Sequence, residues 1–176
     1  MRNLFTCRAF MRFRFATRLL VLASIIPAPA VALAAVSAAD YRASLLEIYG
    51  KYQGVLALRD ACNSAFPKTQ PVNEKAFAAW QKRHRRLHDE LDQRFAMMVR
   101  AYSKDEKEYS RNYGKYQGAV LKQRDEARQS LLMETRGDLE ERCRGLPEFL
   151  QGRESDLESE FANEWVVLRQ WPLQPK

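Results

Sequence analysis

The sequence predicts an all-α protein, an up-and-down helical bundle of about four main helices that carries one disulfide. Apolar residues recur at spacings of three and four along residues 38–170, which is the pattern of amphipathic helices. No proline lies between Pro71 and Pro147, and only seven glycines occur in 176 residues. Because proline interrupts helices and glycine weakens them, this composition favours long helices. No sustained alternation of apolar and polar residues predicts a strand.

The N-terminus has the features of a secretory signal peptide, which we expect to span residues 1–34 and to be cleaved. Residues 1–18 are basic, and the apolar stretch that follows ends in the small-residue motif Ala32-Leu33-Ala34. The alternative is an uncleaved membrane anchor, which Pro27 and Pro29 disfavour because each removes a helix hydrogen bond. The sequence therefore predicts a bacterial periplasmic or secreted protein without a membrane span after cleavage.

The charge of the chain is concentrated in that N-terminal segment. The formal net charge is +7, but residues 1–34 hold five arginines and no acidic residue. The remaining 24 basic and 22 acidic residues leave a balance of +2. This balance, together with export, excludes nucleic acid as the expected partner.

Two cysteines remain in the expected mature chain, Cys62 and Cys143, since Cys7 lies in the segment to be removed. An even number of cysteines in an oxidising compartment predicts a disulfide between them. Such a bond would close a loop of about 80 residues and stabilise the fold by about 4 kcal/mol in the chain-entropy model. The alternative, a reactive thiol, has no supporting pattern around either cysteine.

Capping residues and breakers divide the mature chain into helices. Asn73 is the expected N-cap of the second helix, and the capping box Ser103-x-x-Glu106 marks the start of the third. Gly137 is expected to end the third helix, and Asp138 to cap the next one. The expected helices span residues 38–66, 73–102, about 105–137, about 138–144 and 148–169, and residues 171–176 form a flexible tail. The apolar stripe continues in phase through residues 102–109, so one continuous rod remains an alternative to a break there.

Each of the first three helices carries an apolar stripe that we expect to face the core. The first stripe is Tyr41, Leu45, Ile48, Tyr52, Val55, Cys62 and Phe66; the second is Phe77, Trp80, Leu87, Leu91, Phe95, Met98 and Tyr102; the third is Tyr109, Tyr113, Tyr116, Val120, Ala127 and Leu131. The spacing places each set on one helix face.

The hexapeptide YGKYQG occurs twice, at residues 49–54 and 113–118. It contains four of the seven glycines, Gly50, Gly54, Gly114 and Gly118. Glycine inside a helix costs about 1 kcal/mol relative to alanine, so their presence requires a reason. We expect these glycines to let two helices pack closely. The alternative is an exposed surface of Tyr, Lys and Gln that binds a ligand.

Two histidines, His84 and His88, lie one helical turn apart, and Asp92 lies one turn further. These are candidate ligands of a divalent metal. The cations around them would repel a metal ion, so we expect a partly exposed histidine pair, with no metal and no cofactor. A small metal-dependent hydrolase that uses this pair remains an alternative.

The densest basic cluster comprises Lys82, Arg83, Arg85 and Arg86. The sequence favours charge complementarity within the chain for this cluster, because residues 73–102 carry +3 and residues 147–170 carry −4. The cluster is also the candidate contact surface for an acidic protein or another anionic component of the envelope. No nucleophile elbow, P-loop or nucleotide fingerprint is present, so no catalytic residue is predicted. The sequence thus favours an exported, non-catalytic helical protein that binds another envelope macromolecule, as an adaptor, an inhibitor or a holding chaperone. A protein tethered by an uncleaved N-terminus is a further alternative.

Overall fold

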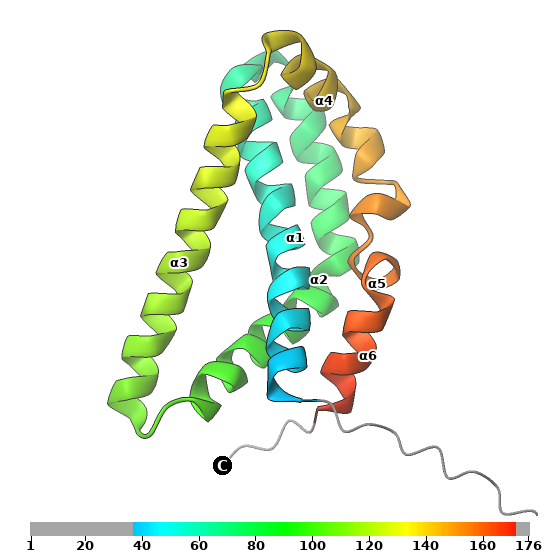
Figure 1. The fold of residues 1–176 in the computed structure, drawn as a ribbon. Coiled ribbons are helices and arrows are strands. Elements are labelled where there is room, and N and C mark those ends of the chain that lie inside the picture. The colour runs from blue at the N-terminus through cyan, green and yellow to red at the C-terminus, as the bar shows by residue number, and fades with distance from the viewer. Residues whose placement is uncertain (1–36, 172–176) are drawn as a thin grey trace, which may run out of the picture. The chain divides into compact units, whose positions relative to one another are not determined.

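The computed structural model describes residues 37–171, and within them every regular element is helical (Figure 1). The main helices are α1 (Ala38–Ala65), α2 (Gln70–Ala101), α3 (Glu106–Leu132) and α4 (Arg136–Phe149). The short elements are η1 (Pro67–Thr69), η2 (Arg153–Ser155), α5 (Leu157–Glu160) and α6 (Ala162–Gln170). The expected signal peptide and all but the first residue of the expected tail lie outside the described residues.

The helices form the predicted up-and-down bundle. α1 and α2 run in opposite directions, α3 returns parallel to α1, and the segment from α4 to α6 runs back along the other side (Figure 1). α1 is central, because it packs against α2, α3, α4 and α6. None of the helices in residues 37–171 combines the length and the apolar character needed to cross a membrane.

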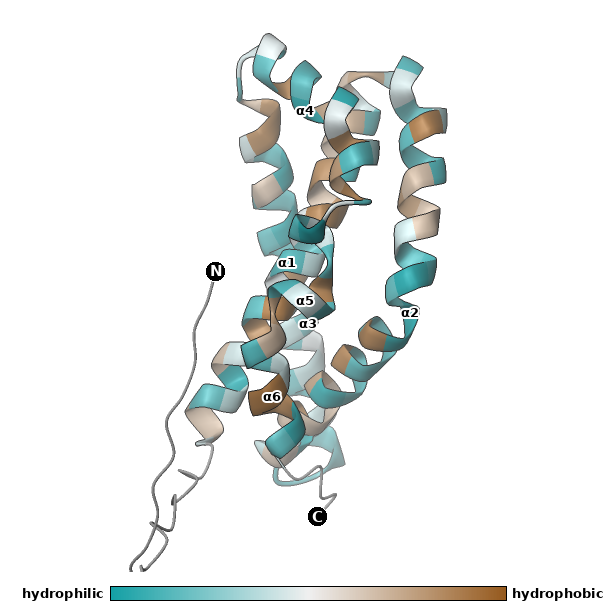
Figure 2. Ribbon diagram, turned by 90° about the vertical axis from the view of Figure 1, so that its right-hand side faces the viewer, coloured by the Kyte–Doolittle hydropathy of each residue, from teal (hydrophilic) through white to brown (hydrophobic). Residues whose placement is uncertain are grey.

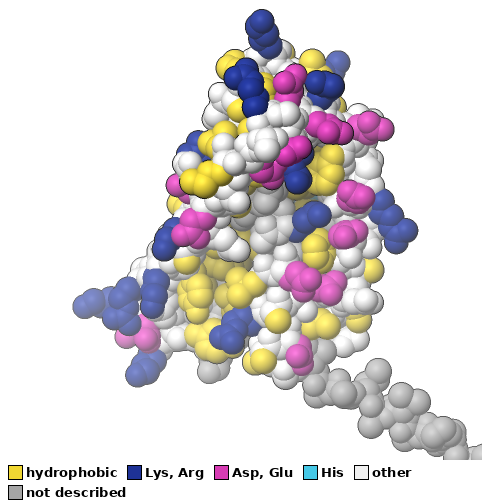
Figure 3. All heavy atoms as spheres, turned by 45° about the horizontal axis from the view of Figure 1, so that its top comes forward, with side chains coloured by type: hydrophobic (Ala, Val, Ile, Leu, Met, Phe, Trp, Pro, Cys, Tyr) yellow, Lys and Arg dark blue, Asp and Glu magenta, His cyan; other side chains and the backbone are white. Residues whose placement is uncertain are grey.

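The core lies between α1, α2 and the C-terminal segment. Figure 2 shows hydrophobic and hydrophilic positions intermixed along each helix, as amphipathic helices require. On the face of the molecule that Figure 3 draws, basic, acidic and hydrophobic side chains are intermixed. The largest fully buried side chains include Trp80, Trp165, Leu45, Ile48, Leu91, Leu146 and Leu168. Both tryptophans find acceptors: Trp80 Nε1 donates to the Ser155 carbonyl at 2.9 Å, and Trp165 Nε1 to the Leu157 carbonyl at 2.8 Å. Burial therefore leaves neither indole N–H unpaired.

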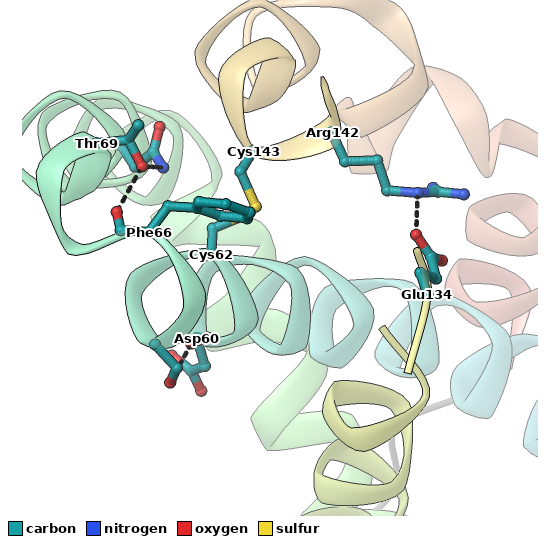
Figure 4. The surroundings of a disulfide bond; sticks show 9 residues. Asp60, Cys62, Phe66, Thr69, Glu134, Arg142 and Cys143 are labelled. Carbon is teal, nitrogen blue, oxygen red and sulfur yellow. Dashed lines mark hydrogen bonds and ion pairs between the residues drawn. A yellow bond between two sulfur atoms is a disulfide. The ribbon is translucent and has the colours of Figure 1, made fainter. Parts of the chain in front are cut away.

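The predicted disulfide is present between Cys62, near the end of α1, and Cys143 of α4 (Figure 4). The two Cα atoms are 5.2 Å apart, and both side chains are buried. The two cysteines lie side by side because α3 ends at Leu132 and the chain turns back into α4. Arg142 Nε donates to Glu134 Oε2 at 3.0 Å across this turn.

The predicted break between the second and third helices is confirmed, but the cap is different. α2 ends at Ala101, and Asp105 caps α3 by accepting the Glu108 N–H at 2.8 Å. Ser103 Oγ instead donates to the Val99 carbonyl at 2.8 Å, closing the end of α2. The prediction was wrong by two residues because Ser103-x-x-Glu106 overlaps Asp105-x-x-Glu108, and the carboxylate forms the cap.

The predicted start of the second helix at Asn73 is also wrong. α2 begins at Gln70, with Pro71 in its first turn, where a missing N–H costs nothing. Asn73 is buried inside the helix, and its Nδ2 donates to Thr69 Oγ1 at 3.2 Å. The first helix, in contrast, begins as predicted, at Ala38 after the Ser37 N-cap.

The C-terminal boundaries differ most from the prediction. Thr135, rather than Asp138, occupies the N-cap of α4, and its Oγ1 accepts the Asp138 N–H at 3.3 Å. α4 then continues through Pro147 to Phe149, so the expected uninterrupted helix over residues 148–169 is wrong. Asp156 caps the next helix by accepting the N–H groups of Glu158 and Ser159. Pro147 lacks the N–H that would donate to the Cys143 carbonyl, and α4 ends two residues later, at Phe149.

Candidate functional site

The four cations of the predicted contact surface all lie exposed on α2; we call Lys82, Arg83, Arg85 and Arg86 the α2 basic surface. Arg83 Nη2 donates to the Leu150 carbonyl at 2.5 Å, which ties the end of α4 to α2. Within residues 37–171, no carboxylate forms an ion pair with any of the four. This surface therefore presents positive charge to solvent.

The acidic C-terminal segment does pack against α2, but through other side chains. Arg94 Nη1 donates to the Leu168 carbonyl at 2.5 Å, and Arg169 of α6 lies 3.5 Å from Glu90 of α2. The Asp156 carboxylate lies 4.0 Å from His84 Nε2. The Arg169–Glu90 pair joins a cation of the C-terminal segment to a carboxylate of α2, which is the reverse of the net charges of the two elements. Docking of this segment thus leaves the α2 basic surface without a carboxylate partner in the described residues.

His84 is buried, so the prediction of a partly exposed pair is wrong for this residue. Its Nδ1 lies 3.0 Å from the Trp80 carbonyl, and its Nε2 lies 3.4 Å from the Leu157 N–H. These partners assign the proton to Nδ1 and leave Nε2 as an acceptor. Burial lowers the pKa of the imidazole, which favours the same neutral form. His84 joins α2 to α5, and neither ring nitrogen is free for a metal.

His88, one turn further along α2, is half-buried, in contrast to the buried His84. Its Nδ1 is 3.6 Å from Asp92 Oδ2, and its ring centroid is 4.4 Å from that of Tyr52. Across residues 37–171 no three His, Cys, Asp or Glu side chains come together in an arrangement that would hold a metal ion. The candidate ligands His84, His88 and Asp92 are therefore not assembled into a metal centre by the fold.

The two YGKYQG copies lie on parallel helices, one on α1 and one on α3. The copies are 64 residues apart, and Asp60 of α1 forms an ion pair with Arg124 of α3, also 64 residues apart. Arg59 Nη2 approaches the same carboxylate at 2.6 Å. Burial raises the pKa of Asp60, but hydrogen bonds from Arg124 and Arg59 outweigh it and hold that pKa below its ordinary value. The register of α3 on α1 thus matches the register of the repeat.

An aromatic cluster joins the two copies through Phe95 of α2. The Phe95 ring stacks on Tyr49 of the first copy, with centroids 5.5 Å apart. It meets Tyr113 and Tyr116 of the second copy edge-on, at 5.8 and 6.0 Å. Burial, followed by the nearby Asp92 carboxylate, raises the pKa of Tyr49 to about 12, so its hydroxyl stays protonated and donates to Asp92.

A cavity of about 300 Å³ opens between α1, α2 and α3 beside this cluster. Its lining includes the equivalent glutamine of each copy, Gln53 and Gln117. The remaining lining residues are Tyr49, Tyr52, Leu56, His88, Phe95, Val120, Leu121 and Arg124; we call this site the repeat groove. Gln53 Oε1 is buried and has no hydrogen-bond partner within residues 37–171. The groove brings together polar and apolar groups from three helices.

The four repeat glycines lie in open surroundings. A Cβ built on Gly50, Gly54, Gly114 or Gly118 would meet no atom within 4 Å outside the local helix backbone. Close helix packing, the expectation for these residues, therefore does not require glycine in the described part of the chain. The ligand-surface alternative needs this open space.

Sequence reasoning did not identify Arg124, Phe95 or His88 as residues of one site. The available signal was the 64-residue offset, which pairs Asp60 with Arg124 and Gln53 with Gln117 once the two helices are taken as parallel. Comparison with protein-family models, with curated proteins and with solved structures finds no match to this chain.

Proposed function

We propose that this chain is exported and acts without catalysis, by binding an anionic macromolecule of the cell envelope through the α2 basic surface. An adaptor, an inhibitor or a holding chaperone would work in this way. The observation that supports the proposal is the exposure of four cations within five consecutive residues, with no ion-pair partner in the described residues. Like charges at this spacing repel one another, and an anionic partner would relieve that repulsion.

The α2 basic surface lies on a helix whose position is fixed by its packing. Leu87 and Leu91 on the same helix are buried, and Arg83 is held by the Leu150 carbonyl. A partner therefore meets cations on a helix whose opposite face is fixed in the core, so little backbone order has to be gained on binding.

Export is supported by the cysteines. Cys62 and Cys143 are bonded and buried, and structural disulfides persist in oxidising compartments. The N-terminal sequence pattern points to the same compartment. Intact mass and N-terminal sequencing of the protein recovered from the periplasm test this part. We expect cleavage near Ala34 and no free thiol; an uncut chain in the cytosol with all three cysteines as free thiols contradicts it.

The binding proposal is tested by charge reversal. The triple variant Lys82→Glu, Arg85→Glu and Arg86→Glu spares Arg83, which has a structural contact. The control variant Lys68→Glu, Lys104→Glu and Lys107→Glu changes the net charge equally at exposed positions elsewhere. Affinity capture from solubilised envelope, quantified for the wild type and both variants, is the measurement.

We expect the first variant to lose captured material and the control to retain it. Capture by the wild type should also weaken as salt is raised from 0.05 to 0.5 M, because exposed charges are screened over about 8 Å at physiological ionic strength. Equal capture by the wild type and the first variant overturns the assignment of this surface. Equal loss in both variants shows attraction by net charge alone, which overturns it as well.

A further inference from the structure

We propose that a cavity at one end of the bundle binds a small organic anion, an aromatic ring that carries one carboxylate or phosphate group, between Arg42 of α1 and Lys115 of α3. The cavity has a volume of about 370 Å³, and its described lining residues are Arg42, Tyr102, Asn112, Lys115, Tyr116 and Ala119; we call it the basic cavity. It lies between the start of α1, the end of α2 and the first half of α3, which meet at the same end of the bundle (Figure 1). This site shares no residue with the α2 basic surface and does not depend on it.

The charge of the lining selects an anion. Arg42 and Lys115 come from different helices, both side chains are exposed, and no carboxylate is among the described lining residues. Within residues 37–171 neither cation forms an ion pair. Two cations at one cavity repel each other, and an oxyanion between them would turn that repulsion into attraction.

The carboxylates near this end of the bundle have other partners. Asp40 accepts hydrogen bonds from the N-cap residue of α1. Glu106 forms an ion pair with Arg100, and Glu108 lies 3.4 Å from Arg111. The positive charge of the basic cavity is therefore not compensated by these acidic side chains.

The two copies of YGKYQG use their equivalent residues differently, and only the second copy lines the basic cavity. In the first copy, Lys51 Nζ lies over the Phe149 ring, 5.8 Å from its centroid, and Tyr52 is buried in the core. In the second copy, Lys115 is exposed and Tyr116 is half-buried. Within the described residues, Lys115 thus has no counterpart to the contact that Lys51 makes, and a bound anion would supply one.

The aromatic side chains of the cavity suit a ligand with a ring. Tyr102 is 51% exposed, although its side chain is large and largely apolar. The Tyr116 ring is held in place by Phe95, which it meets edge-on at 6.0 Å. The volume is at the lower end of the range for small-molecule sites, and an inorganic anion alone would leave both tyrosine rings uncovered. An aromatic ring could contact them in the stacked or edge-on geometry that such rings prefer.

Asn112 adds a neutral donor beside the two cations. Its Nδ2 donates to Ser103 Oγ at 3.1 Å, and Ser103 Oγ donates in turn to the Val99 carbonyl at 2.8 Å. These bonds position the carboxamide and use one of the two hydrogens on Nδ2. The second hydrogen is left for an oxygen of the ligand, which again favours an oxyanion over a cation.

Titration of the purified, disulfide-bonded protein with small molecules tests the proposal. The aromatic anions are benzoate and phenyl phosphate. Inorganic phosphate lacks the ring, hexanoate replaces it with an aliphatic chain, and benzyl alcohol lacks the charge. Amide NMR shifts are followed at neutral pH and constant ionic strength up to about 10 mM probe, which detects affinities near 1 mM.

The test variants are Arg42→Gln and Lys115→Gln. Lys122→Gln is the matched control, because it removes the same charge from an exposed position of α3 outside the cavity. We expect benzoate or phenyl phosphate to shift the amides of residues 102 and 112–119, and each test variant to weaken that binding about tenfold, the value of one charged hydrogen bond. The control should bind as the wild type does. Tm should be the same in all three variants, since the substituted side chains are exposed, and this separates lost binding from lost folding.

Four results overturn the proposal. The first is the absence of shifts at these residues with both aromatic anions. The second is equal binding of benzyl alcohol, which would show that charge plays no part. The third is equal weakening in the test and control variants, which would show attraction by net charge alone. The fourth is binding of inorganic phosphate or hexanoate as tight as that of the aromatic anions, which would identify an adventitious ion only or an acyl site. None of these results affects capture by the α2 basic surface, so the two proposals fail separately.

Discussion

The helices α2 and α3 differ sharply in how they are held, although each expected apolar stripe was equally regular. Ten residues of α2 are buried, whereas none of the residues of α3 reaches that degree of burial. α3 packs along α1 through partly buried side chains, among them Tyr113, Tyr116 and Leu131, and through the Arg124–Asp60 ion pair. The repeat groove lies beside this partly buried packing.

The difference follows from the neighbours of each helix. α2 packs against α1, α3, α4 and α5, so its inward face, with Phe77, Trp80 and Leu91, is covered from several sides. α3 packs mainly on α1, and even Leu131 on its inward face stays half-buried. Periodicity predicts which face of a helix turns inward, but the number of neighbouring elements decides how far that face is buried.

The largest expected effect is the truncation of a core residue of α2. Trp80→Ala removes a fully buried ring and its hydrogen bond to the Ser155 carbonyl, so we expect a loss of about 4–5 kcal/mol in the free energy of unfolding. For a matched comparison, Leu91→Ala on α2 should cost about 2–5 kcal/mol, and Leu131→Ala on α3 should cost less because its side chain is only half-buried. Urea denaturation measures all three. Similar losses in the two leucine variants would contradict the contrast between the helices.

Removal of the disulfide should lower the free energy of unfolding nearly as much as Trp80→Ala does. The effect should reach α3 through its connection to α4. Opening the Cys62–Cys143 loop, with a sequence separation of 81, predicts a loss of about 4 kcal/mol. Hydrogen exchange of the Cys62→Ser/Cys143→Ser variant should show lost protection in α3 and α4 before α2, because few buried contacts hold α3. Reduction of the wild type should reproduce the effect and leave the double variant unchanged. Uniform loss of protection across α2 and α3 would show that the two helices unfold as one unit.

The buried imidazole on α2 predicts a pH dependence of stability. Burial lowers the pKa of His84 in the folded state, so the unfolded chain takes up the proton first, near pH 6.5. Stability from this group is complete above that pH and falls as the pH drops below it, by at most about 1.4 kcal/mol per pH unit. The difference in unfolding free energy between pH 7 and pH 5 should shrink in His84→Gln. His88→Gln, which leaves His84 buried, should retain it; an unchanged dependence in His84→Gln would contradict the assignment.

The outcome of the sequence predictions can be traced to particular residues. The bundle, the helix break at residues 102–105 and the disulfide were predicted correctly because each depends on local chemistry or on a simple length constraint. The cap at Asp105 and the course of α4 through Pro147 were not. Two capping motifs overlap at residues 103–108, and a proline is expected to interrupt a helix, whereas α4 continues two residues beyond Pro147. The burial of His84 depends on Leu157, 73 residues away, and periodicity carries no information about such a partner.

The candidate site shows the same limit. The basic residues and the repeat were visible as local patterns. The repeat groove was not, because Phe95 and His88 come from α2, whereas the two glutamines come from α1 and α3. The predicted up-and-down bundle already makes the first and third helices parallel. The missing information is which residues of α2 face the two copies of the repeat, and this depends on the packing of three helices.

The smallest expected effect concerns the repeat glycines. It distinguishes close packing of two helices from an exposed surface as the reason for these glycines. In Gly54→Ala and Gly118→Ala the added methyl group meets open space, and alanine favours the helix, so each variant should be stabilised by about 0.5–1 kcal/mol. If these glycines instead serve close packing of α1 on α3, the same variants should be destabilised. Gly137→Ala in the first turn of α4, where the added group also meets open space, is the control for propensity alone. Thermal unfolding of the three variants shows whether each change raises or lowers stability. Stabilisation by alanine at residues 54 and 118 would mean that glycine at these positions lowers the stability of the fold.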